Sequence, residues 1–190
     1  AEGTRVVDAT GKLVLPGAID VHTHMQLPFG GTVSADDFEG GTRAAAFGGV
    51  TTIIDFAIQS KGSGLAETVE RRRAEADPKV CIDYSLHLAI TDWNRNTRGE
   101  IREIIESGIP SFKLFMVYRK EGWMVDDGAL FGILSEVAKY GGLVGVHAEN
   151  AFIIDALVEQ FLAEGRLGCE YHPRSRPNFV EGEAIRRAIY

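Results

Sequence analysis

The chain has 190 residues, of which 20 are Lys or Arg and 27 are Asp or Glu, so its formal net charge is −7. Hydrophobic residues make up 45% of the chain and charged residues 25%, a balance typical of a folded globular protein and not of a disordered one. The acidic charge argues against a nucleic-acid partner, and the chain has no apolar run of the ~20 residues that a membrane span needs. Cys81 and Cys169 are expected to be reduced thiols of a cytoplasmic protein.

Short apolar strands alternate with helices along the chain. The expected strands are residues 18–22, 50–56, 80–90, 111–116 and 143–147, and the expected helices are residues 35–47, 65–76, 98–106, 127–140 and 151–163. Strands of this kind pair in parallel, with the helices packed outside the sheet. The pattern therefore predicts an α/β fold, which is either an open doubly wound sheet or a closed (β/α)8 barrel.

The end of the first strand favours the barrel. A doubly wound sheet usually carries a glycine-rich phosphate loop there, whereas this strand ends in His22-Thr23-His24. A complete barrel needs ~250 residues, and the sequence provides only about five strand–helix units. We therefore expect an incomplete TIM-like barrel in which residues 16–190 are the first part of the barrel.

His22 and His24 are candidate metal ligands. Two residues separated by one position on a strand point to the same face, with Cα atoms ~6.6 Å apart. Imidazoles placed in this way can converge on a single ion, with Zn–N bonds of ~2.0–2.1 Å. The alternative is a pair of ordinary interior histidines, whose polar atoms would then need other partners.

Lys113 is a further candidate because it lies in an otherwise apolar strand. Burial lowers the pKa of a lysine and leaves a neutral amine, which can add carbon dioxide to form a carbamate with two anionic oxygens. The alternative is a lysine on an edge strand that reaches solvent. His147 ends the next strand, so three successive signals fall at the carboxyl ends of strands, where barrel enzymes carry their chemistry.

These motifs resemble a known family. The run from Pro16 to His24 looks like the opening signature of the cyclic amidohydrolases. Further stretches are similar to the dihydropyrimidinase and hydantoinase members of that family: residues 35–38, 48–56, 83–87, 112–116, 146–150 and 175–184. The resemblance covers nearly the whole chain.

The resemblance implies a centre of two divalent metal ions, usually zinc. His22 and His24 would hold one ion, His147 the other, and a carbamate formed from carbon dioxide on Lys113 would bridge them. A further histidine and a proton-shuttling aspartate would come from later strands, beyond Tyr190. The resemblance also implies a homotetramer and a small β-sandwich domain, of which residues 1–15 would be the tail.

The implied activity is hydrolysis of the cyclic amide bond of dihydropyrimidines or 5-substituted hydantoins by a hydroxide that bridges the metals. Tyr118 matches the family's tyrosine that donates a hydrogen bond to the developing oxyanion. Leu27, in the apolar and glycine-containing loop of residues 25–31, is expected to line the substrate's ring together with Phe115. A purely structural packing role for Leu27 and Phe29 fits the sequence equally well.

Two alternatives remain. An allantoinase or dihydroorotase would use the same metals with a different pocket, but the dihydroorotase arginine expected near the first histidine pair is absent from residues 25–29. A non-catalytic, oligomeric relative of dihydropyrimidinase typically loses the second histidine and the lysine. The presence of His24 and Lys113 favours the enzyme.

The other polar residues have simpler interpretations. His87 lies within a strand and is expected to be a hydrogen-bonded core histidine, while His172 is expected to make a structural contact. Asp20 shares the face of the histidine pair and is a candidate acceptor for one imidazole. Asp55 fits either that role or burial beside a helix end. Helix N-caps are expected at Asp127 and Asn150.

Overall fold

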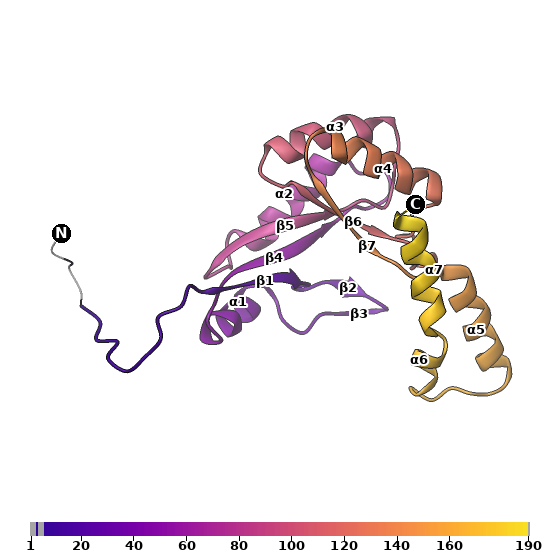
Figure 1. Ribbon diagram of the computed structural model, residues 1–190, viewed down its shortest axis with the longest axis horizontal. Coiled ribbons are helices and arrows are strands. Elements are labelled where there is room, and N and C mark those ends of the chain that lie inside the picture. Colours follow the sequence, from indigo (N-terminus) through magenta and orange to yellow (C-terminus); the bar gives the residue numbers. More distant parts are fainter. Residues whose placement is uncertain (1–2, 4–5, 190) are drawn as a thin grey trace.

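The structure is a computed structural model that describes residue 3 and residues 6–189 (Figure 1). The strands are β1 (Ala18–Thr23), β2 (Pro28–Phe29), β3 (Thr32–Val33), β4 (Val50–Ile58), β5 (Asp83–Ala89), β6 (Ser111–Phe115) and β7 (Leu143–His147). The helices are α1 (Phe38–Phe47), α2 (Leu65–Ala76), α3 (Arg95–Glu106), α4 (Asp127–Lys139), α5 (Ala151–Ala163), α6 (Tyr171–Arg174) and α7 (Asn178–Ile189). The segment 6–17 contains neither helix nor strand and extends away from the body of the protein (Figure 1).

Five strands form one parallel sheet in the order β1-β4-β5-β6-β7. Each strand therefore pairs with the next long strand along the chain, and a helix connects each pair from β4 onward. The register places Asp55 of β4 opposite Leu86 of β5, and Phe115 of β6 opposite His147 of β7. The short strands β2 and β3 form a separate antiparallel hairpin.

The helices α1 to α4 all pack on the same face of this sheet. Successive strand residues point to opposite faces, so the residues of the helix-facing side are found in the core with the helices. Leu86, Leu88, Phe112 and Leu114 belong to a buried cluster that also contains helix residues: Leu65, Val69, Ile101, Ile104, Leu130, Ile133 and Val137. A doubly wound sheet carries helices on both faces, whereas a barrel carries them only outside. The sheet is therefore the curled sheet of an incomplete TIM-like barrel, as predicted.

Side-chain caps fix the starts of four helices, among them α1, where the Asp37 carboxylate accepts a hydrogen bond from the Gly40 amide. Asn94 forms a capping box with Thr97 at the start of α3, and Asn150 accepts backbone hydrogen bonds at the start of α5, as predicted. The prediction for Asp127 is wrong. The N-cap of α4 is Asp126, whose carboxylate accepts a hydrogen bond from the Ala129 amide at 2.7 Å, and Asp127 is the first helical residue.

Several expected boundaries and elements also differ. Helix α1 begins at Phe38 and not at residue 35, α3 begins at Arg95 and not at residue 98, and β5 begins at Asp83 and not at residue 80. The β2–β3 hairpin replaces most of the loop expected at residues 25–31, with Gly30 and Gly31 at positive φ in its turn. Helices α6 and α7 were not predicted from the sequence, and Figure 1 shows both beside α5 at one end of the protein.

Within the described residues, no helix has the length and apolar character that crossing a membrane requires. The thiols of Cys81 and Cys169 are exposed and form no disulfide.

Candidate metal centre

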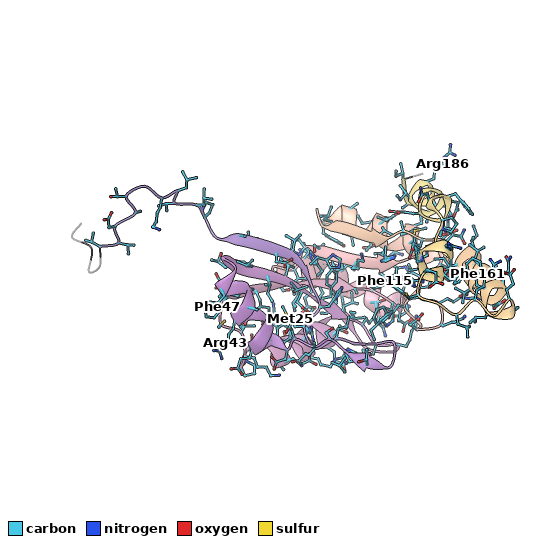
Figure 2. The ribbon with its side chains drawn as sticks, turned by 90° about the horizontal axis from the view of Figure 1, so that it is seen from below. Met25, Arg43, Phe47, Phe115, Phe161 and Arg186 are labelled. Atoms are coloured by element: carbon cyan, nitrogen blue, oxygen red, sulfur yellow. The ribbon has the colours of Figure 1, made fainter. Side chains whose placement is uncertain are left out.

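The candidate site lies where the strands end, on the face of the sheet opposite to the helices. β1 leads to His22 and His24, β6 carries Lys113 and Phe115, and β7 ends at His147. A cavity of about 350 Å³ is lined by all seven residues predicted for the site together with three others: His22, His24, Leu27, Lys113, Phe115, Tyr118, His147, Phe29, Ser34 and Trp123. Figure 2 shows Phe115 in the interior beside the group of helices α5 to α7.

His22 and His24 lie side by side. Their ring centroids are 5.1 Å apart at an interplanar angle of 83°, and each centroid is 4.6 Å from that of Phe56. Burial lowers the pKa of both imidazoles, and the positive charge of Lys113 lowers that of His22 further. Both rings are therefore neutral near pH 7, which is the form that binds a metal.

His24 also carries an unsatisfied polar atom. Its Nδ1 is buried and has no hydrogen-bond partner within the described part of the chain. A buried ring nitrogen without a partner costs free energy unless another group binds it. This nitrogen is therefore available to bind a metal ion or another group.

Lys113 is half-buried on the sheet face that lines the cavity. Its Nζ lies 5.6 Å from the centroid of the Phe115 ring, and its backbone pairs with Gly145 of β7. Burial lowers the pKa of the amine. Desolvation thus shifts Lys113 toward the neutral, nucleophilic form that carbamate formation requires.

His147 is oriented by a carboxylate. Its Nε2 lies 2.8 Å from Glu149 Oε2, and the other oxygen of Glu149 is 3.6 Å from Arg176 Nε. Metal-binding histidines commonly use one ring nitrogen for the metal and the other for such an acceptor. The contact with Glu149 leaves Nδ1 of His147 for a second partner.

Tyr118 follows β6 with a backbone φ of 64°, an uncommon conformation for a bulky residue. Its ring centroid lies 5.3 Å from that of His147 and 5.2 Å from that of Phe29 in the hairpin. Burial, together with the negative charge of Glu149, raises the pKa of the Tyr118 hydroxyl. The hydroxyl therefore stays protonated and able to donate a hydrogen bond at neutral pH.

The donor set fits a divalent metal that prefers nitrogen ligands. Within the described residues, no three His, Cys, Asp or Glu side chains form a cluster able to hold an ion. Three imidazoles and one lysine line the same cavity without meeting at a single point, and a lysine supplies metal-binding oxygens only after it is carboxylated. Neutral rings, a buried nitrogen without a partner and a desolvated amine are the features of this structure that match such a centre.

The remaining polar candidates have structural contacts. His87 contacts the Ser111 hydroxyl through Nδ1, and its Nε2 lies 2.9 Å from the Val21 carbonyl, so it is hydrogen-bonded as predicted, although it is half-buried and not in the core. Asp20 accepts a hydrogen bond from the backbone amide of His22 at 3.1 Å, so this carboxylate contacts the main chain of the histidine and not the ring nitrogens. His172 lies in the exposed helix α6 and contacts Arg176 at 3.4 Å.

Sequence reasoning missed two contributors to the site, Glu149 and Trp123, whereas Phe29 lies in the loop expected to line the substrate. Glu149 falls within the matching stretch 146–150, and its position two residues after His147 is a signal for a partner of that ring. Trp123 and Phe29 complete the aromatic wall, with ring centroids 5.2 Å apart. Their contribution depends on two connecting segments that fold over the strand ends, and strand periodicity carries no information about such segments.

Comparisons with known proteins identify the family of this chain. Residues 13–174 match the model of the amidohydrolase family. The chain is 50% identical over 190 residues to a dihydropyrimidinase of Rattus norvegicus, covering all of this chain and 36% of that protein, and 48% identical over 184 residues to a D-hydantoinase of Streptomyces coelicolor, covering 97% and 39%.

The solved structure of a dihydropyrimidinase from Brevibacillus agri matches with a TM-score of 0.95 at 46% identity, covering all of this chain and 41% of that one. The chain thus spans about two fifths of the length of these relatives. The family model matches most of the chain, the relatives match its whole length, and the fold is almost superimposable. The chain therefore belongs to the amidohydrolase family.

Proposed function

We propose that this protein is a metal-dependent hydrolase that opens the cyclic amide bond of dihydropyrimidines or 5-substituted hydantoins. The observation that carries the proposal is the single cavity lined by His22, His24, Lys113, Tyr118 and His147. The names of the relatives, dihydropyrimidinase and D-hydantoinase, support this substrate class. This chain covers about two fifths of the relatives' length, so the proposed activity is that of the longer protein to which the chain would belong.

In this proposal His22 and His24 would hold one divalent ion, His147 would hold a second, and a carbamate on Lys113 would supply oxygen ligands to both. The neutral amine of Lys113 bonds to the carbon of carbon dioxide and releases a proton, giving a carbamate with two oxygens for the ions. Zinc is the proposed metal, since imidazole and anionic oxygen ligands suit it. When bound, such ions polarise a carbonyl oxygen and lower the pKa of water toward neutrality.

Other side chains of this chain would stabilise the transition state, cover the substrate and orient a ligand. The protonated hydroxyl of Tyr118 donates a hydrogen bond to the oxygen that becomes negative as the amide carbonyl is attacked, a contact worth about 3 kcal/mol. Leu27 and Phe115, with the neighbouring aromatic rings, cover the flat ring of the substrate and exclude water from it. Glu149 holds the ring of His147 in one orientation.

The proposal includes the wider organisation of the protein. We propose that residues 16–190 form the first part of a hydrolase barrel, and that the remaining histidine ligand and the proton-shuttling aspartate belong to later strands. Residues 1–15, of which 1, 2, 4 and 5 lie outside the described residues, would be the tail of a small β-sandwich domain. A homotetramer and a cytoplasmic location complete the proposal; the second is supported by the two thiols that form no disulfide.

Metal analysis and one variant test this function. The purified protein is expected to contain zinc or another divalent metal and to hydrolyse dihydrouracil or a 5-substituted hydantoin, measured by loss of the cyclic substrate. His24→Ala is expected to lose both metal and activity, while His172→Ala, a change of the same type in an exposed helix, keeps both. An active protein without metal, or a fully active His24→Ala variant, eliminates the metal-dependent mechanism.

A further inference from the structure

A buried ion pair lies on the helix-facing side of the sheet, next to the end of β1, which leads to His22 and His24. Asp55 of β4 is fully buried and Arg72 of α2 is 8% exposed. Arg72 Nε donates to Asp55 Oδ1 at 3.0 Å, and a second guanidinium nitrogen contacts the same oxygen. The Arg72 guanidinium also stacks on the ring of Phe38, with 4.5 Å between its central carbon and the ring centroid.

Both charged groups bind the residue that follows His24. Asp55 Oδ2 accepts a hydrogen bond from the Met25 amide at 2.8 Å, and Arg72 Nη2 donates to the Met25 carbonyl at 2.6 Å. The same carboxylate oxygen of Asp55 accepts from the Thr23 hydroxyl at 3.0 Å. The residues on either side of His24 are thus held by one pair of buried charges.

The Met25 side chain adds a third constraint. It is 9% exposed and packs against Gly41 of helix α1, where a Cβ atom would lie 2.3 Å from its sulfur. The absence of a side chain at Gly41 lets α1 approach the strand end. Backbone and side chain of Met25 are therefore both anchored on the helix side, and this fixes the direction in which the preceding imidazole points.

A contribution to stability alone does not explain why the hydrogen bonds of this ion pair converge around His24. Replacing a buried ion pair by apolar residues of similar volume is often neutral or stabilising, so such a pair alone is weak evidence for a structural role. Here the hydrogen bonds converge on the neighbours of the imidazole whose Nδ1 is buried without a partner. Thr23 and Asp55 share the helix-facing side, opposite to the cavity, so the pair acts through the backbone and does not itself touch a metal.

We propose that Asp55 and Arg72 are positioning residues that hold His24 in the orientation required for metal binding. This proposal rests on the metal-dependent function proposed above. Its physical content is preorganisation: a ligand that is already aimed at the ion loses little conformational freedom on binding, so the affinity for the metal is higher. Partners that orient a ligand in this way typically contribute a factor of roughly 10 to 100 in metal affinity.

The decisive variant removes both charges at once. Asp55→Leu combined with Arg72→Met keeps the volume of the pair and leaves no unpaired buried charge, so the protein is expected to fold. Its urea midpoint is expected to fall, because the Met25 amide and carbonyl and the Thr23 hydroxyl lose their partners. Its affinity for Zn²⁺, measured by competition with a chromophoric chelator, is expected to fall by roughly 10- to 100-fold. A purely structural role would leave the affinity of this folded variant unchanged.

Two single variants complete the experiment. Glu75→Gln neutralises the other carboxylate that pairs with Arg72, 2.6 Å away on the solvent side, and is expected to leave zinc affinity unchanged. Thr23→Val removes one hydrogen bond to Asp55 and is expected to weaken zinc binding severalfold, which decides the question if the double variant does not fold. If the double variant folds and binds zinc with wild-type affinity, the positioning role is overturned. If only Thr23→Val folds, wild-type affinity of that variant has the same consequence. Absence of zinc binding by the unaltered protein overturns instead the metal-dependent function.

Discussion

Leu114 tests the register of β6, on which the orientation of Lys113 depends. Its side chain is fully buried among the helices, whereas its neighbours Lys113 and Phe115 line the cavity on the other face. Leu114→Ala deletes three carbon atoms, and at ~0.8 kcal/mol per buried carbon the lost transfer free energy is about 2.4 kcal/mol. The cavity left behind raises the expected loss in unfolding free energy to about 3–5 kcal/mol.

Urea unfolding followed by circular dichroism measures this loss. The slope of the unfolding free energy against urea concentration should stay unchanged, which shows that the variant exposes the same surface on unfolding. The matched control is Leu167→Ala, because that leucine is 75% exposed and its truncation should change the unfolding free energy by less than ~0.5 kcal/mol. Equal losses in the two variants would refute the register. A shift of one residue would place Leu114 in the cavity and turn Lys113 toward the helices.

Three further predictions follow from individual contacts. Burial and a hydrogen bond to Asp77 raise the pKa of Tyr84 to about 12, so between pH 10 and 12 the unfolded state loses this proton while the folded state keeps it, and the unfolding free energy falls as pH rises. Tyr84→Phe should flatten that alkaline decline, and superimposable pH profiles would contradict the assignment. Asn150→Ala should cost about 1 kcal/mol in urea unfolding through loss of the α5 cap, and a loss below ~0.3 kcal/mol would contradict that role. Glu149→Gln should weaken Zn²⁺ binding roughly 10-fold by removing the anionic partner of His147, and an unchanged competition titration would exclude that role.

The parallel strands and their connecting helices could be predicted because local sequence encodes them. Each strand of the sheet is a short apolar run between turn residues, and each of the first helices shows apolar residues at helical spacing. The candidate site was predictable for a related reason. Parallel strands bring their carboxyl ends to one edge, so polar residues at successive strand ends, such as His22, Lys113 and His147, must come close together.

The parts that could not be predicted depend on contacts between distant segments. The β2–β3 hairpin has strands of only two residues each, too short for a periodic pattern. Asp126 and Asp127 are both suitable N-caps, and the sequence alone does not decide between adjacent acidic residues. The role of Asp55 stayed open because its partner, Arg72, lies in a charged run that resembles an exposed helix face. Only the packing of α2 on the sheet turns that arginine inward.

The contact between Met25 and Gly41 links a helix to the cavity although neither residue lines it. Any side chain at position 41 would compete with the thioether for the same volume, so the buried Met25 side chain would have to change its position. Variation in α1, remote from the chemistry in sequence, would thus be transmitted to the imidazole of His24. Substitutions meant to enlarge the cavity should therefore keep position 41 fixed, because a side chain there would disturb His24, the proposed metal ligand, before it changed the volume of the cavity.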